Sequence, residues 1–213
     1  MNSYNNQDNF VTIELTREMK KEAFINAIDR TCKITRRFIP KFQLITHAET
    51  NYTGCLAELA VRKYFGLPLE LEPITGYSPD NGDVEYNGLI YDVKNQNMSK
   101  RSFNMLIDGI IKETDYKGTF RFTTKHLYHI PKYTGGIIWT VCNYNSSDYL
   151  KYLPLGDDKE IRKELLHNIN EIIIVGISTS ESFNNKESTW IDPSGTTMQS
   201  ENILFHYSEL ESI

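Results

Sequence analysis

The chain has 213 residues, a formal net charge of −5 and 39% hydrophobic residues, which suits one soluble globular domain with its own core. Its three cysteines lie far apart and form no CxxC pair, so neither a disulfide framework nor a zinc cluster follows from them, and three buried thiols are favoured. The polar N-terminus lacks a signal-peptide core and the longest apolar run, 172–177, is too short to span a bilayer, so we expect a cytoplasmic protein.

The N-terminal third predicts a tail, a strand and two helices. Residues 1–10 are expected to be a disordered tail, and residues 11–213 a single domain. A short strand is expected over 11–15, followed by a helix that reaches Cys32 with Thr16 as its N-cap. Residues 51–54 resemble a helix breaker, although a helix could already begin near them, and 54–65 predict a helix that stops at Gly66.

The rest of the chain predicts mostly strands. Residues 67–82 should be irregular, and Asn87-Gly88 between two β-prone runs predicts a hairpin over 83–94. Residues 95–135 favour no single element. Strands are expected over 136–143, 171–178 and 202–207, a helix over 158–169 and a polar loop over 179–200.

The charges are unevenly distributed along the chain. From residue 94 to 132 there are eight Lys or Arg and three acids, whereas residues 145–213 carry five basic residues and twelve acids. A basic middle is compatible with contacts to a phosphate backbone, and equally with an ordinary solvated surface of mixed charge.

The predicted hairpin places acidic residues opposite one another. A two-residue turn at Asn87-Gly88 fixes a register in which Asp83 faces Asp92, with Cβ atoms about 5 Å apart. Two carboxylates at that spacing repel each other unless a cation lies between them. Lys94 projects from the same face as Asp92, while Val93 points into the core and keeps its carbonyl near the carboxylates. Such oxygen ligands suit Mg²⁺.

Glu58 lies in the preceding predicted helix, at the edge of its apolar stripe. A carboxylate in such a place needs a partner, and Arg62, four residues further on, is the simplest one. Glu58 gains interest only in combination with the hairpin that follows it.

Together these residues resemble a known family. Gly54-Cys-Leu-Ala-Glu58-Leu-Ala-Val, then Gly82-Asp83, then Tyr91-Asp92-Val93-Lys94 are similar to the short motifs of the PD-(D/E)XK nuclease superfamily, over about residues 50–97. The resemblance implies an α/β fold, a restriction-endonuclease-like αβββαβ core with a mixed central sheet flanked by helices. It also implies a metal-dependent hydrolase that cleaves DNA as an endonuclease with Mg²⁺, for which Mn²⁺ can substitute. A homodimer would suit cleavage of both strands.

The resemblance assigns roles to particular residues. The metal ligands are expected to be Asp83, Asp92, the Val93 carbonyl and Glu58; the catalytic set is expected to be Glu58, Asp83, Asp92, Lys94 and Gln96. Gln96 resembles the polar residue that often follows the lysine. The basic middle segment supplies the nucleic-acid contacts, expected at Lys100, Arg101, Arg121 and Lys125. Asp80, in the literal Pro-Asp dipeptide, is the alternative to Asp83, which we prefer because the hairpin places only Asp83 opposite Asp92.

Several alternatives remain open at this level. The same fold could cleave RNA, or could be a non-catalytic module that binds nucleic acid. A protein-interaction module in which Asp83 and Asp92 are turn and surface residues is a third hypothesis. His126 and His129 have a spacing that metal ligands sometimes use, but ordinary histidines are the simpler interpretation.

Overall fold

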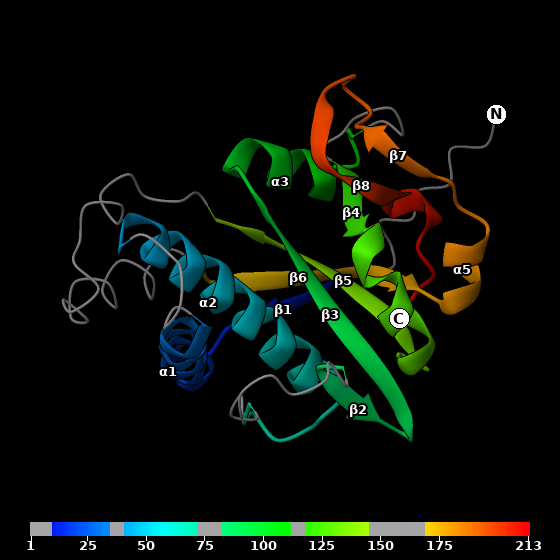
Figure 1. Cartoon of the computed structure of the whole chain (residues 1–213). Helices are drawn as coiled ribbons and strands as arrows, with labels where there is room; N and C mark the ends of the chain where they lie inside the picture. The colour runs from blue at the N-terminus through cyan, green and yellow to red at the C-terminus, as the bar shows by residue number, and fades with distance from the viewer. Residues whose placement is uncertain (1–9, 35–40, 72–81, 112–117, 145–168) are drawn as a thin grey trace.

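The computed structural model describes residues 10–34, 41–71, 82–111, 118–144 and 169–213 (Figure 1). Its larger sheet has five strands in the order β1-β6-β5-β3-β2, and its smaller sheet has three in the order β4-β8-β7. The strands are β1 (Val11–Glu14), β2 (Val84–Tyr86), β3 (Leu89–Met98), β4 (Thr119–Thr123), β5 (Gly136–Asn143), β6 (Glu171–Ser178), β7 (Ser188–Ile191) and β8 (Thr197–His206). The helices are α1 (Arg17–Ile34), α2 (Lys41–Tyr64), α3 (Lys100–Ile107) and α5 (Ser180–Asn184), with the 3-10 segments η3 (Thr124–Lys132) and η5 (Tyr207–Glu209).

The larger sheet is mixed and covered on both faces. Strand β5 runs parallel to β3, and the other neighbours in this sheet are antiparallel. Helices α1 and α2 lie on one face, while α3, η3 and the smaller sheet lie on the other (Figure 1). The expected α/β class with a mixed sheet between helices is therefore confirmed. Along the chain, two described strands, β2 and β3, lie between α2 and α3, where the expected αβββαβ core has three.

Two hydrophobic cores result from this layering. Residues of α1 and α2 pack against the side chains of Tyr91 and Val93, which project from one face of β3. Residues of α3, β4 and β8 pack against Ile137, Trp139 and Val141, which project from β5 on the other face. Since side chains alternate along a strand, Asp92 and Lys94 must project toward the second core.

The two long helices begin and end for local reasons. The Thr16 hydroxyl accepts from the Met19 N–H at 3.3 Å, which confirms the predicted N-cap of α1. Helix α2 stops where Gly66 adopts a φ of 69°, as predicted for a C-terminal glycine. The predicted break at 51–54 is wrong, because α2 runs through it with Tyr52 and Thr53 buried. Packing outweighs the cost of about 1 kcal/mol that a glycine imposes on a helix.

The predicted hairpin forms with three of its four predicted pairs, whereas the fourth, Asp83 opposite Asp92, does not form. Val84 pairs with Tyr91, Glu85 with Ile90 and Tyr86 with Leu89. Asn87 and Gly88 both have positive φ angles, 51° and 75°, as a type I′ turn requires.

The later predictions have mixed outcomes. The strands over 136–143 and 171–178 are confirmed as β5 and β6, whereas the strand at 202–207 is the second half of the longer β8. The polar loop over 179–200 is wrong, because α5, β7 and the start of β8 lie there; Phe183 anchors α5 in the second core. The helix expected over 158–169 falls almost wholly outside the described residues.

The disordered tail expected over residues 1–10 lies almost wholly outside the described residues. Of the expected N-terminal tail only Phe10 is described, and its ring packs edge-on against Tyr207 at 5.9 Å between centroids. No helix in the described part of the chain combines the length and hydropathy that a membrane span requires.

Candidate functional site

The Asp83 carboxylate lies at the edge of β3, where β2 begins. The Asp83 N–H donates to the Tyr91 carbonyl at 2.8 Å, so the chain leaves the regular ladder here and does not continue to a fourth pair with Asp92. Instead, Asp83 Oδ2 accepts from the Val93 N–H at 2.8 Å. The Asp83 carboxylate therefore lies against the backbone of the residue between Asp92 and Lys94.

The Val93 carbonyl oxygen is a further candidate metal ligand. The N–H and C=O of one strand residue project from the same edge, and the Val93 N–H points at Asp83. Its carbonyl is thus directed along the same edge, beyond the point where β2 begins. The Val93 side chain is buried in the first core, as the sequence predicted.

Asp92 and Lys94 form a close ion pair on β3. Lys94 Nζ lies 2.9 Å from Asp92 Oδ1 and 2.7 Å from Oδ2. The Asp92 side chain is 3% exposed, whereas that of Lys94 is 42% exposed, so the pair has a buried acidic end and an accessible ammonium. Two residues further on and on the same face, Gln96 Oε1 is buried without a hydrogen-bond partner among the described residues.

Glu58 is buried in α2 and is held by an arginine of α1. Both of its carboxylate oxygens accept from Arg30, with Nη2–Oε2 at 2.8 Å. Arg62, the partner that the sequence suggested, instead donates to the Pro68 carbonyl at 3.4 Å. The sequence hypothesis of a Glu58–Arg62 pair is therefore wrong.

The electrostatics around Glu58 connect it to Asp83. Burial, and then the negative charge of Asp83, raise the pKa of Glu58 to about 7, and the hydrogen bonds and charge of Arg30 oppose that rise. Burial lowers the pKa of Arg30, but the hydrogen bonds to Glu58 and the negative charges of Glu58 and Asp83 raise it above its usual value. Glu58, Arg30 and Asp83 therefore lie close enough to influence one another.

Arg30 is the site residue that sequence reasoning missed. It occupies the position eleven residues after Met19, which on a helix falls on the same face. That stripe also carries the buried Ala23 and Ala27. A charged residue at the end of an apolar stripe needs a buried partner, and this is the signal that could have identified it.

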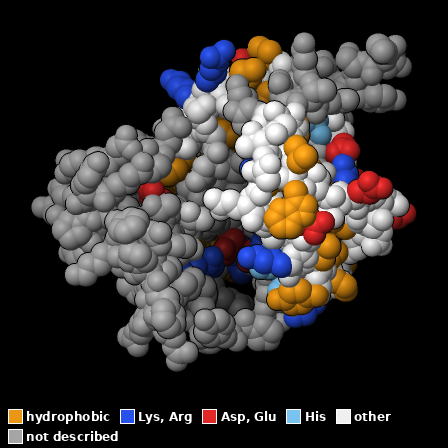
Figure 2. Space-filling view, turned by 45° about the horizontal axis from the view of Figure 1, so that its top comes forward, with side chains coloured by type: hydrophobic (Ala, Val, Ile, Leu, Met, Phe, Trp, Pro, Cys, Tyr) orange, Lys and Arg blue, Asp and Glu red, His pale blue; other side chains and the backbone are white. Residues whose placement is uncertain are grey.

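The acidic side chains reach this region from different directions. Glu58 comes from the helical layer, Asp83 from the sheet edge and Asp92 from the opposite face of β3. Across the residues that the structure describes, no three His, Cys, Asp or Glu side chains gather as a metal group. On the face shown in Figure 2, acidic side chains lie recessed in a hollow with Lys or Arg and His side chains beside it.

The oxygen atoms around Val93 are of the kind that divalent cations bind. Asp83 accepts from the Val93 N–H, so the Val93 carbonyl projects toward the same side of β3 as Asp83. Asp92 adjoins Val93 in the chain and projects from one face of the strand, as does Gln96, whose buried amide oxygen is neutral. Carboxylate and carbonyl oxygens are the ligands that Mg²⁺ and Mn²⁺ accept. Asp80, the alternative to Asp83, lies outside the described residues.

The predicted nucleic-acid contacts are not gathered in one place. Lys100 and Arg101 are exposed in the first turn of α3, and Lys125 is exposed in η3. At about 3.3 Å per residue, the end of β3 that leads into α3 lies roughly 20 Å from Asp92.

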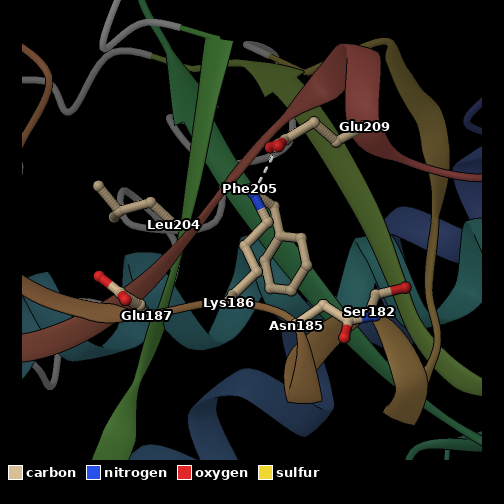
Figure 3. A pocket seen from close by; sticks show the side chains of 7 residues that line it. All are labelled: Ser182, Asn185, Lys186, Glu187, Leu204, Phe205 and Glu209. Carbon is tan, nitrogen blue, oxygen red and sulfur yellow. Dashed lines mark hydrogen bonds and ion pairs between the residues drawn. The ribbon is translucent and has the colours of Figure 1, made fainter.

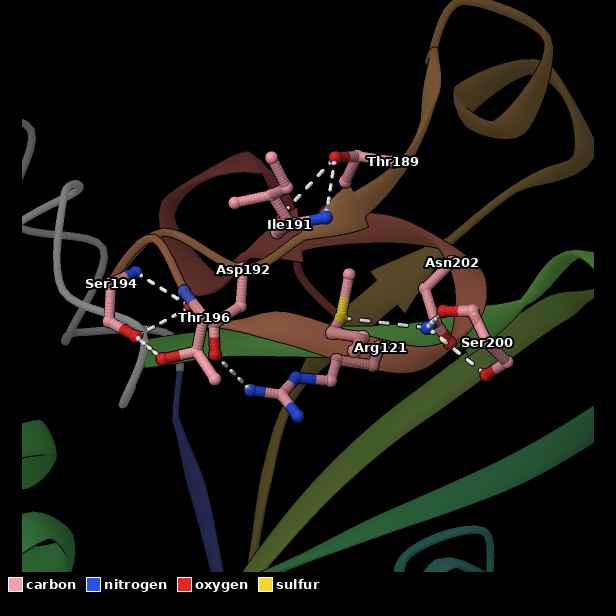
Figure 4. A network of polar contacts seen from close by, with 9 residues as sticks. Arg121, Thr189, Ile191, Asp192, Ser194, Thr196, Ser200 and Asn202 are labelled. Carbon is pink, nitrogen blue, oxygen red and sulfur yellow. Dashed lines mark hydrogen bonds and ion pairs between the residues drawn. The ribbon is translucent and has the colours of Figure 1, made fainter.

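Arg121 has a structural partner that the sequence did not suggest. Its Nη2 donates to Asp192 Oδ2 at 3.1 Å, while Asp192 Oδ1 accepts from the N–H groups of Ser194 and Thr196 (Figure 4). Arg121 on β4 therefore fixes the loop between β7 and β8.

The other chemically interesting residues have structural surroundings. His126 and His129 stack in η3 with ring centroids 6.2 Å apart, and they belong to no described metal group. Cys55 and Cys142 are buried free thiols, as predicted, and burial raises the pKa of both. The side chain of Cys32 lies outside the described residues.

A pocket of about 600 Å³ opens between α5 and β8, away from these carboxylates (Figure 3). Lys186 crosses it, 2.6 Å from Glu209 and 5.1 Å above the centre of the Phe205 ring. The pocket is thus lined by this ion pair, the Phe205 ring and a second glutamate, Glu187.

Comparison with protein-family models, with curated proteins and with solved structures finds no match for this chain.

Proposed function

We propose that this protein is a metal-dependent nuclease with a restriction-endonuclease-like core, and that it hydrolyses phosphodiester bonds, most favourably in DNA. The observation that carries the proposal is the meeting of Asp83 with the Asp92–Val93–Lys94 strand. Two carboxylates, a carbonyl and an accessible ammonium come together within a few residues of one strand edge. The preference for DNA comes from the resemblance of the motifs.

Each residue has a role in this proposal. Asp83, Asp92 and the Val93 carbonyl would hold Mg²⁺, which supplies a water of lowered pKa and offsets charge on the phosphate. Lys94 keeps its ammonium beside Asp92 and reaches solvent, so it can donate to a phosphate oxygen as charge develops. Gln96 offers its buried amide oxygen to the attacking water. Lys100, Arg101 and Lys125 would contact the backbone of the nucleic acid.

A cleavage assay tests the proposal. Supercoiled plasmid, linear duplex, single-stranded and branched DNA, and RNA would each be incubated with Mg²⁺, Mn²⁺ or EDTA. We expect metal-dependent cutting of DNA that Asp92→Ala and Lys94→Ala abolish. Lys186→Ala is the matched control, because Lys186 also forms a close ion pair but lies away from the site.

The substrate panel separates the alternatives. Cutting of RNA alone would keep the active site and change the substrate. Binding without cutting, unchanged in Asp92→Ala, would favour a non-catalytic module of the same fold. Cutting that persists in both site variants would show that these residues are not the catalytic ones.

A further inference from the structure

Segment η3 presents an exposed aromatic ring on a firm support. Tyr128 is 69% exposed, and its ring rests against the His129 ring with 3.9 Å between centroids. His129 is buried and stacks in turn with His126 at 6.2 Å and with Tyr133 at 6.4 Å. Ile130 and Tyr133 anchor the segment in the second core. The Tyr128 ring is therefore a flat apolar surface that is held in place and open to a ligand.

The chain around this ring carries positive charge. No Asp or Glu occurs in residues 116–147, although the whole chain has a net charge of −5. Lys125, near the start of η3, and Lys132, at its end, are both exposed. The Glu201 carboxylate reaches the start of the segment, but one of its oxygens already accepts from Ser188 at 2.6 Å. The η3 surface, formed by Tyr128, Lys125 and Lys132, thus combines an open ring with two ammonium groups.

The η3 surface lies at the same end of the larger sheet as the candidate site. Three residues after η3, the Gly135 N–H donates to the Ile90 carbonyl at 2.8 Å, and Ile137 then pairs with Asp92. Segment η3 also covers the face of this sheet toward which Asp92 and Lys94 project. A chain of nucleotides bound on η3 can therefore continue toward the Lys94 ammonium, whose side chain is 42% exposed.

We infer that the η3 surface is a stacking platform for unpaired bases, through which the protein binds a single-stranded segment of DNA. This inference rests on the proposed function for the nature of the partner, and it narrows the substrate to DNA that carries unpaired bases. A base stacks on an exposed aromatic ring whatever its identity, while neighbouring phosphates meet the ammonium groups. The bases of a duplex already stack on one another, so the η3 surface selects for free base faces and not for sequence.

Fluorescence anisotropy in EDTA tests the inference, because the probe is then bound without metal-dependent cutting. The probes are a labelled oligothymidylate of about 20 nucleotides, its duplex with oligoadenylate, and an abasic strand of the same length and charge. We expect Tyr128→Ala to weaken binding of oligothymidylate about tenfold and to leave the abasic strand and the duplex unaffected. Tyr128→Phe keeps the ring and should bind like the wild type. Lys125→Ala should weaken binding of both single strands and lower the slope of affinity against salt by about 0.7.

Trp190→Ala is the matched control, because Trp190 is another exposed aromatic residue, at 53%, but lies on β7 outside the η3 surface; we expect wild-type binding. Wild-type protein that does not bind oligothymidylate, or Tyr128→Ala that binds it unchanged or loses both single strands equally, would overturn the inference. Cleavage of DNA by the wild type would still sustain the nuclease. Selective loss in Tyr128→Ala without cleavage of any substrate would sustain the platform and overturn the nuclease.

Discussion

At the scale of single residues, the Lys94–Asp92 pair makes stability depend on metal. Lys94→Ala removes a cation from a buried carboxylate, and since Lys94 is 42% exposed we expect a loss of only about 1 kcal/mol without metal. With Mg²⁺ the difference from wild type should shrink, because the dication replaces the lost charge. Urea unfolding with Mg²⁺ and with EDTA measures both values. An equal loss in the two buffers would argue against a cation beside Asp92.

A second residue-scale prediction concerns the contact between α2 and the end of β5. The Tyr144 hydroxyl donates to Glu49 Oε1 at 2.6 Å, and both residues are buried. Tyr144→Phe takes a hydrogen-bond donor from a buried carboxylate, which should lower the free energy of unfolding by about 2 kcal/mol. Tyr128→Phe serves as the control, because Tyr128 is 69% exposed. Equal stability of the two variants would contradict the buried bond.

At the scale of elements, the hairpin turn should control the geometry of the site. Gly88 has a φ of 75° and open space around its Cα, so Gly88→Ala meets backbone strain without a clash. We expect a loss of about 1 kcal/mol. Asn87→Gly should be nearly neutral, because glycine accepts the φ of 51° at that position. Chemical denaturation of the two variants compares them directly; a larger loss in Asn87→Gly would contradict this account of the turn.

The same hairpin shows which elements the sequence could predict. Asn-Gly and alternation specified β2, β3 as far as Lys94 and their register, and the buried apolar runs specified β5 and β6. These signals are local. The sequence did not predict β7 or the first part of β8, because residues 188–200 are mostly polar and exposed. Strand β7 exists through its pairing with β8. Strand β8 in turn pairs with β4, which lies far away in the sequence.

The same distinction between local and long-range contacts applies to the candidate site. Asp92, Val93 and Lys94 follow from strand alternation, and Asp83 follows from the turn to within one residue of register. Arg30 lies 28 residues from Glu58, and the contact needs α1 to pack on α2. The rule that side chains four residues apart on a helix pair with each other favoured Arg62, because it considers only contacts within one helix. The long-range charge contact was therefore the part that the sequence could not provide.

At the scale of the whole molecule, the C-terminal segment joins the two cores. Leu210 is buried in the second core, while Ile213 packs against the first and its carbonyl accepts from the Tyr64 hydroxyl at 3.2 Å. Between them, Glu211 exchanges two backbone hydrogen bonds of 2.9 Å with Ile177 on β6. Four residues thus connect η5, β6 and α2.

Removing residues 210–213 should therefore destabilise the entire fold. The loss of a buried leucine and two backbone hydrogen bonds amounts to about 3 kcal/mol, which for a chain of this size lowers the melting temperature by roughly 8 °C.

Gly176→Ala should have a similar effect without truncation, because a Cβ there would lie 2.6 Å from the Glu211 carbonyl oxygen and push the segment away. Gly54→Ala is the control: it lies within α2 with no atom within 4 Å of the added methyl, so it should raise stability slightly. Thermal unfolding followed by calorimetry compares the three variants with the wild type. If the truncated chain has the melting temperature of the wild type while Gly176→Ala has a lower one, the alanine acts on β6 itself. The C-terminal segment then does not join the cores.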